Sequence, residues 1–138
     1  MTSSLWARER SWGLEGCLPP LANAATARDF VYVDDVCEAF LAATAPCGSG
    51  EVYNIGPGRQ VSLADAVEVI RTKLAVTTAP QWDTMASRPW DASRWIANPS
   101  KAKDHLGWLA ETTFSEGIQR TIEWLRLETA VHDRYLRN

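Results

Sequence analysis

The chain has 138 residues, enough for one domain with a modest core or for part of a larger domain. Hydrophobic residues make up 46% of it and charged residues 22%, a composition typical of folded globular proteins rather than of disordered tails. The formal net charge of -3 predicts no general attraction to nucleic acid or to an anionic membrane, although a local basic site for a small anion is compatible with it.

Cysteine and histidine spacing bears on the compartment and on metal binding. The three cysteines, Cys17, Cys37 and Cys47, form no CxxC pair, which favours reduced thiols and a cytoplasmic location. His105 and His132 lie far apart in the sequence, so we expect no His-based zinc site. No apolar run approaches transmembrane length, and charged residues interrupt any signal-peptide core near the N-terminus. The sequence predicts a cytoplasmic protein without a membrane segment or a metal.

The first ordered unit is expected after residue 27, because the residues before it show no period and "LPPLANAATA" suggests an extended arm. "FVYV" (30–33) has the apolar, β-branched and aromatic composition of a buried strand. Asp34 and Asp35 could be read as a catalytic pair, but their place at a helix start favours capping, with Asp35 and Glu38 as the capping pair. The following helix should bury an apolar face that includes Val36, Cys37, Phe40, Leu41 and Thr44, with Cys37 as an inert core thiol.

The pattern then repeats. "EVYNIG" (51–56) reads as a second short buried strand, and "PGRQ" as a turn. Ser62 and Asp65 form a second capping pair before a helix with apolar residues at helical spacing through Leu74. Short strands that alternate with helices predict an α/β fold with parallel strand pairing.

The last third is expected to be helical. Asn98 suits an N-cap and Gly107 a helix terminator, and Thr113 with Glu116 makes a third capping pair. Gly117 lies inside the last helix, where glycine costs about 1 kcal/mol relative to alanine, which suggests close backbone contact. The tryptophans at 108 and 124 are expected in the core or at helix-docking positions.

Two arginines are candidates for anion recognition. Arg28 precedes the first expected strand, and Arg88 lies in the tryptophan-rich, non-helical segment "SRPWDASRW". A guanidinium group binds oxyanions in a bidentate manner, and neighbouring aromatic rings can stack on a base. Asp91 could accept hydrogen bonds from sugar hydroxyls. From spacing alone, local ion pairs between Arg28 and Asp29 and between Arg88 and Asp91 explain the same residues.

In order and spacing, four segments resemble the extended short-chain dehydrogenase/reductase family, the NAD-dependent epimerases and dehydratases of nucleotide sugars. They are "RDFVYVDDV", "EVYNIGPGRQVSLADAVEVI", "RPWDASRWIANPSKAKDHLGW" and "TTFSEGIQRTIEWLR", and the resemblance covers about residues 28–128 of the chain. It implies a partial Rossmann-like NAD(P)-binding fold, here the substrate-binding C-terminal portion. It also implies that Arg28 and Arg88 contact a substrate diphosphate, that Asp91 lies by the nucleotide ribose, and that Trp95 lies near the nucleotide.

The sequence departs from the family in two ways. It has no GxxGxxG loop, and none of Tyr32, Tyr53 and Tyr135 has a lysine four positions later, so the family's Tyr-xxx-Lys pair is missing. We therefore assign no catalytic or cofactor-binding residue and expect the chain alone to bind no NAD(P), the family's cofactor. The expected organisation is a leader arm (1–27), a substrate-binding portion (28–132) and a tail (133–138).

The resemblance thus predicts a truncated or separated epimerase/dehydratase segment that binds a nucleoside-diphosphate sugar and is not catalytic alone. The alternative is a non-enzymatic interaction or vestigial domain that retains the fold without the ligand. Because "VYNIG" would present an unpaired apolar edge, we expect a homo-oligomer or a partner chain that supplies the dinucleotide-binding half. The alternative is that the N-terminal arm covers this edge within one chain.

Overall fold

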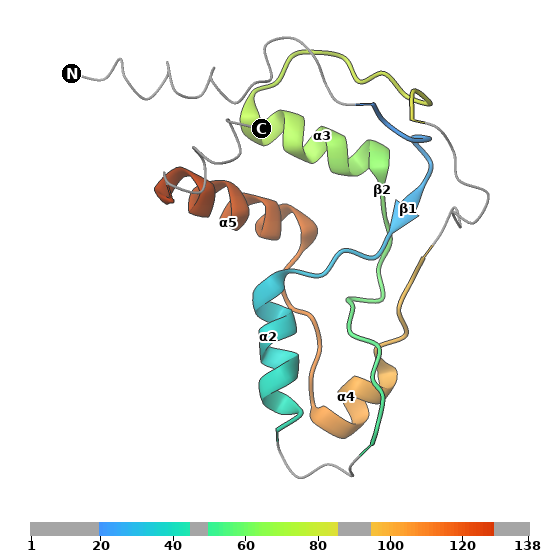
Figure 1. Ribbon diagram of the computed structural model, residues 1–138, viewed down its shortest axis with the longest axis vertical. Coiled ribbons are helices and arrows are strands. Elements are labelled where there is room, and N and C mark those ends of the chain that lie inside the picture. The colour runs from blue at the N-terminus through green and yellow to red at the C-terminus, as the bar shows by residue number, and fades with distance from the viewer. Residues whose placement is uncertain (1–19, 45–49, 86–94, 129–138) are drawn as a thin grey trace.

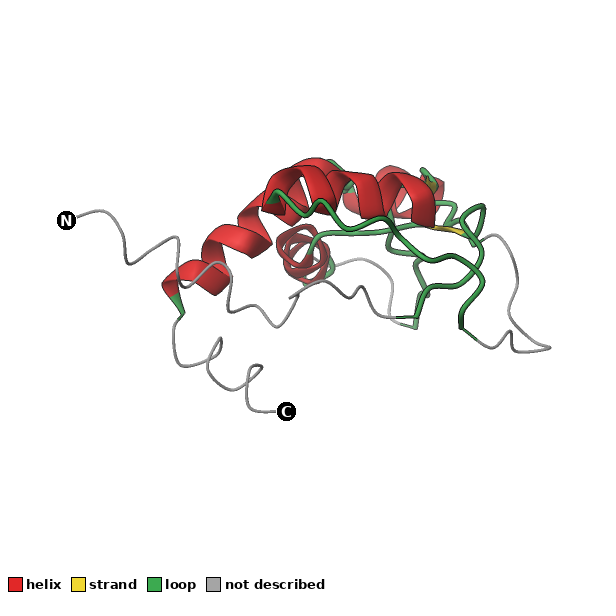
Figure 2. Ribbon diagram, turned by 90° about the horizontal axis from the view of Figure 1, so that it is seen from above, coloured by secondary structure: helices red, strands yellow, loops and turns green. Residues whose placement is uncertain are grey.

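The computed structural model describes residues 20–44, 50–85 and 95–128. Within these ranges the chain forms short strands and helices in a mixed order (Figure 1), which agrees with the expected α/β class. The elements are β1 (Ala27–Arg28), α2 (Val33–Ala42), β2 (Val61–Ser62), α3 (Leu63–Leu74), α4 (Ser100–Leu106) and α5 (Phe114–Leu127). Figure 2 shows loops gathered at one end of the molecule, beside the strand pair. No helix in the described ranges is long and apolar enough to cross a membrane.

The strands differ in place and direction from the prediction. β1 pairs with β2 in antiparallel fashion, with Ala27 opposite Ser62 and Arg28 opposite Val61. The segments 30–32 and 51–55, predicted as buried parallel strands, belong to no strand of the described structure. A strand is defined by hydrogen bonds to a neighbour, and apolar composition alone does not supply that neighbour. The parallel pairing was therefore wrong for the described residues.

Helices α3 and α5 lie side by side (Figure 1). Helix α3 directly follows β2, and α5 follows the loop after α4. Ser62 caps α3, because its Oγ accepts a hydrogen bond from the amide of Asp65 at 3.1 Å, as predicted. Thr113 and Glu116 form the predicted capping box at the start of α5. Gly117 also has the predicted close contact, since a Cβ there would lie 3.1 Å from Cδ2 of Tyr32.

Helix α4 begins one residue later than the composition suggested. Pro99 is the N-cap of the helix, and Asn98 instead accepts a hydrogen bond from the amide of Ser100 through its Oδ1 at 3.0 Å. Gly107 ends the helix with φ of 67°, a left-handed conformation that glycine adopts at little cost. The predicted terminator is thus confirmed.

Asp35 joins α2 to the loop between α4 and α5 rather than capping α2. Its buried carboxylate accepts hydrogen bonds from the hydroxyl of Thr112 at 2.8 Å and from the amide of Thr112 at 3.1 Å. Its backbone carbonyl accepts a hydrogen bond from Nε1 of Trp108 at 2.8 Å. The N-cap of α2 is Tyr32, which makes no side-chain cap hydrogen bond. The capping role predicted for Asp35 was wrong, because the helix begins at Val33 and places Asp35 on its inner face.

The core around this junction is small and rich in alanine. Ala39 and Ala102 are buried with Trp108, and several half-buried apolar residues pack against them: Ala42, Tyr53, Ile55, Leu106 and Ala110. Ala39 of α2 and Ala102 of α4 thus meet in one cluster through small side chains. Trp108 was correctly predicted as a core residue, whereas Trp124 is half exposed.

The apolar face predicted for the interior of α2 points outward. Phe40 and Leu41 are exposed, and Cys37 is exposed as well, so it is not a core thiol. The inner face is instead formed by Asp35 and Ala39. The hydrogen bonds of Asp35 determine which side of α2 faces the core, and they leave the larger side chains outside.

We expect Asp35→Ala to lower the free energy of unfolding by about 1–3 kcal/mol, because it leaves the buried amide and hydroxyl of Thr112 without their acceptor. Asp34→Ala removes the same charge from the first turn of α2 at an exposed position and should cost less than about 1 kcal/mol. Urea denaturation of both variants measures the difference. Equal losses would show that the Asp35 hydrogen bonds do not stabilise the fold.

The capping box predicts a pH dependence. Hydrogen bonds from the hydroxyl and amide of Thr113 lower the pKa of Glu116 below its ordinary value of 4.5. A carboxylate whose pKa is lowered by folding stabilises the native state above its unfolded pKa, and this contribution is lost as the pH falls through the folded pKa. Glu116→Gln should therefore reduce the decline in unfolding free energy between about pH 6 and pH 3. In a Thr113→Ala background, which removes the hydroxyl and keeps the amide, the same substitution should have a smaller effect, and an unchanged effect would contradict the mechanism.

Candidate functional site

The candidate site begins where β1 ends. Arg28 is the last residue of β1 and is half-buried; its Nη1 donates a hydrogen bond to the carbonyl of Ala27 at 2.9 Å. Pairing with Val61 holds the backbone of Arg28 in place, so the position of the guanidinium group depends on the β1–β2 register. The next residue, Asp29, turns toward other parts of the chain.

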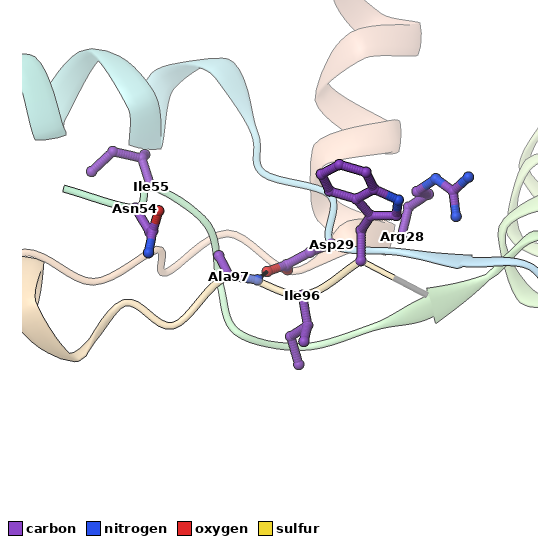
Figure 3. A pocket seen from close by; sticks show the side chains of 7 residues that line it. Arg28, Asp29, Asn54, Ile55, Ile96 and Ala97 are labelled. Carbon is purple, nitrogen blue, oxygen red and sulfur yellow. Dashed lines mark hydrogen bonds between the residues drawn. The ribbon is translucent and has the colours of Figure 1, made fainter. Parts of the chain in front are cut away.

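The carboxylate of Asp29 binds three backbone amides from two distant segments. Its Oδ2 accepts hydrogen bonds from Ala97 at 2.8 Å and from Gly58 at 3.2 Å, and its Oδ1 accepts one from Arg59 at 3.3 Å. Figure 3 shows the Asp29 side chain directed toward Ala97. Hydrogen bonds with an ionised acceptor are stronger than neutral ones, so this carboxylate fixes the 56–59 turn and the 95–99 segment against the end of β1.

Glycine makes this junction possible. A Cβ at position 56 would lie 2.8 Å from Cβ of Ala97 and 3.0 Å from Oδ2 of Asp29, distances that side chains do not tolerate. Gly58 has φ of 68°, the left-handed region that favours glycine. For "NIGPGR" a strand ending in a turn was predicted; the structure has no strand there but bends at Gly56 and Gly58, and these glycines permit close approach of the backbone.

The segment before the turn is held by Lys101 of α4. Its Nζ donates hydrogen bonds to Oε2 of Glu51 at 2.6 Å and to the carbonyl of Val52 at 3.0 Å, and it lies 5.1 Å from the ring centroid of Tyr53. The hydrogen bond and charge of Lys101 lower the pKa of Glu51. These contacts position the neighbouring residues Asn54 and Ile55.

Arg28, Asp29, Asn54 and Ile55 line one pocket together with three residues from the far segment, Trp95, Ile96 and Ala97 (Figure 3). The pocket has a volume of about 470 Å³, within the range of roughly 300–1,000 Å³ that is usual for small-molecule sites. It combines the guanidinium group of Arg28, the carboxylate of Asp29 and an amide with an aromatic ring and aliphatic side chains. The guanidinium group can bind an anion, and the aromatic ring can pack against a flat ring of a ligand.

Arg28 and Trp95 are two of the four substrate-binding residues predicted from the sequence. Both line this pocket, although they lie 67 positions apart in the chain. Arg88 and Asp91 lie outside the described residues. Sequence reasoning missed Asn54, Ile55, Ile96 and Ala97. The end of an apolar stretch before a glycine turn is a general signal for the first two, because α/β proteins place ligand contacts at strand ends.

The described residues at this turn do not fit a dinucleotide. The amides of Gly58 and Arg59 face the carboxylate of Asp29, whereas pyrophosphate recognition needs such amides to face the ligand. Residues 20–44, 50–85 and 95–128 also contain no group of three or more His, Cys, Asp or Glu side chains that could hold a metal ion.

The GDP-mannose 4,6 dehydratase family model matches residues 11–121 of the chain. UDP-glucose 4-epimerase from Mycolicibacterium smegmatis is 32% identical over 99 residues, which are 72% of this chain and 31% of that protein. Human dTDP-D-glucose 4,6-dehydratase is 33% identical over 104 residues, or 72% of this chain and 29% of that protein. The chain thus spans about a third of the length of these relatives.

The fold is similar to that of solved enzymes. Bordetella bronchiseptica WbmF in complex with NADH has a TM-score of 0.73 and 33% identity, with 95% of this chain and 39% of that chain covered. UDP-glucose 4-epimerase from Thermotoga maritima with UDP-glucose has a TM-score of 0.72 and 29% identity, with 91% and 40% covered. These neighbours confirm the predicted α/β, Rossmann-like class. The chain belongs to the extended short-chain dehydrogenase/reductase family, with the nucleotide-sugar epimerases and dehydratases.

Proposed function

We propose that the chain is the substrate-binding portion of a nucleotide-sugar epimerase or dehydratase and that it binds a nucleoside-diphosphate sugar in the pocket beside β1. The proposed boundaries of that portion are residues 28–132, with 1–27 as a leader arm and 133–138 as a tail. Arg28 and Arg88 bind the diphosphate, Asp91 binds the ribose, and Trp95 lies against the nucleotide. We also propose that the chain is located in the cytoplasm.

The observation that carries this proposal is the meeting of Arg28 and Trp95 in one pocket. A nucleoside diphosphate has charged oxygens beside a flat base, which suits a guanidinium fork beside an aromatic ring. Asp29 supports the same pocket, because the hydrogen bond that its carboxylate accepts from the amide of Ala97 holds the segment that carries Trp95. The names of the relatives point to the same ligand class, since they include UDP-glucose and dTDP-glucose enzymes.

We further propose that cofactor binding and proton transfer belong to another part of the enzyme, on the same polypeptide or on a partner chain. Solved neighbours contain NAD or NADH, so NAD(P) is the cofactor of the family. In this chain the described glycine turn is occupied by a carboxylate, and no tyrosine precedes a lysine by four positions. The 138-residue chain is therefore expected to bind the sugar nucleotide and to leave NAD unbound.

Calorimetry with UDP-glucose, dTDP-glucose, GDP-mannose and NAD tests this assignment. Arg28→Ala and Arg88→Ala should each weaken sugar-nucleotide binding by about 1.5–3 kcal/mol, the cost of a lost charge-assisted hydrogen bond. Arg88→Lys should restore little, because lysine lacks the planar fork. Trp95→Ala should cost about 1–3 kcal/mol through lost stacking.

Lys103→Ala is the matched control, because it removes an exposed cation of α4 that does not line the pocket. If no sugar nucleotide binds, or if the control weakens binding as much as the arginine variants, the proposal is wrong. Submillimolar affinity for NAD would contradict the division of roles. Retention of the fold without any of these ligands would favour a non-enzymatic domain.

A second prediction concerns Asp29, which we expect to position the pocket wall rather than to bind the ligand directly. Asp29→Ala removes all three amide acceptors and should weaken sugar-nucleotide binding more than Asp29→Asn, which keeps one acceptor oxygen. Hydrogen exchange measured by NMR should accelerate at the amides of Gly58, Arg59 and Ala97 in the alanine variant. Unchanged exchange at these amides would show that Asp29 does not hold the pocket wall.

A further inference from the structure

Gln60 lies next to the β1–β2 ladder, at the end where the ladder meets the pocket. The ladder pairs Arg28 with Val61, and continuing its antiparallel register by one residue places Asp29 opposite Gln60. Side chains at opposing positions of an antiparallel pair lie close together on one face. The register that holds Arg28 therefore also brings a second side chain, that of Gln60, to the place where Asp29 binds the pocket wall.

The side chains of Asp29 and Gln60 make complementary hydrogen bonds to the same segment. The carboxylate of Asp29 accepts a hydrogen bond from the amide of Ala97 at 2.8 Å, and Nε2 of Gln60 donates one to the carbonyl of Trp95 at 3.4 Å. Ile96 is the single residue between these two backbone groups. The backbone is thus held on both sides of Ile96, and Gln60 supplies the hydrogen bond nearer to Trp95.

Trp95 has few other restraints in the described part of the chain. The residue is 61% exposed although it lines the pocket. Within residues 20–44, 50–85 and 95–128, the hydrogen bond from Gln60 is the only one to Trp95. Ordering an exposed aromatic side chain costs free energy when a ligand binds, and a backbone that is already held reduces this cost.

Two observations separate this role from ligand contact and from core packing. Gln60 is not among the residues that line the pocket, so it reaches the ligand site only through Trp95. It is also exposed, and a hydrogen bond of 3.4 Å between exposed groups contributes little to the stability of the whole fold. Replacing Gln60 should therefore change the pocket without unfolding the chain.

We propose that Gln60 is a positioning residue for Trp95. Its side-chain amide holds the carbonyl of Trp95, keeps the indole ring oriented in the pocket, and so raises the affinity for the flat ring of a nucleotide. The proposal rests on the proposed function in that the pocket is taken to bind a sugar nucleotide. The position of Trp95 itself is measured without any ligand.

Fluorine NMR of the chain labelled with 5-fluorotryptophan is the ligand-free test. The Trp95 signal is assigned by its loss in Trp95→Phe. Gln60→Met, which keeps the size of the side chain and removes the donor, should move the Trp95 signal toward that of free 5-fluorotryptophan and leave the other signals in place. Gln81→Met is the matched control, because Gln81 is an exposed glutamine that does not line the pocket. An unchanged Trp95 signal in Gln60→Met, or an equal change in the control, would overturn the proposal.

Calorimetry with UDP-glucose tests the consequence for binding. Gln60→Met should weaken binding about three- to tenfold, the range for one neutral hydrogen bond, and should leave the urea midpoint of unfolding unchanged. In a Trp95→Ala background the same substitution should have no further effect, because Gln60 acts through Trp95.

A persistent loss of affinity in the Trp95→Ala background would show direct ligand contact and contradict the positioning role. A lowered urea midpoint would show a structural role instead. If the parent chain binds no UDP-glucose, dTDP-glucose or GDP-mannose, the proposed function fails, whereas the fluorine spectra still decide whether Gln60 holds Trp95.

Discussion

The fold and the pocket depend on the carboxylate of Asp29. It joins the end of β1 to a turn 29 to 30 residues later and to a segment 68 residues later through backbone amides. These bonds are directional, so they set positions as well as distances. Gly56 serves the same junction, since a Cβ there would lie 2.8 Å from Cβ of Ala97 and would force one of the two segments to shift. The pocket wall is therefore held mainly by the three hydrogen bonds of the Asp29 carboxylate and not by a large apolar core.

Asp35 performs a related task for the helices. The buried apolar cluster beside it contains two alanines and one tryptophan, with no large aliphatic side chain fully buried in the described ranges. Such a core gives limited orientation to α2, because small side chains fit in several rotations of a helix. The two hydrogen bonds to Thr112 and the bond from Trp108 select one rotation. The outward direction of Phe40 and Leu41 is a consequence of that selection.

Local features of the sequence predicted local structure well. The Ser62 and Thr113 caps, the Gly107 terminator and the close contact at Gly117 each depend on residues within a few positions or on glycine itself. The α/β class followed from the alternation of short apolar runs with helical patterns, whereas the placement of Arg28 and Trp95 at one ligand came from the family resemblance. What the sequence could not supply was the tertiary partner. Asp35 resembles a cap in sequence, and hydrophobic periodicity marks an apolar face of α2 without saying what covers it.

The inner face of α2 connects the buried cluster to the pocket. Its inner residue Ala39 packs in the cluster that also contacts Ile55, and Ile55 lines the pocket next to Asn54. The packing of α2 and the wall of the pocket are thus parts of one structural unit.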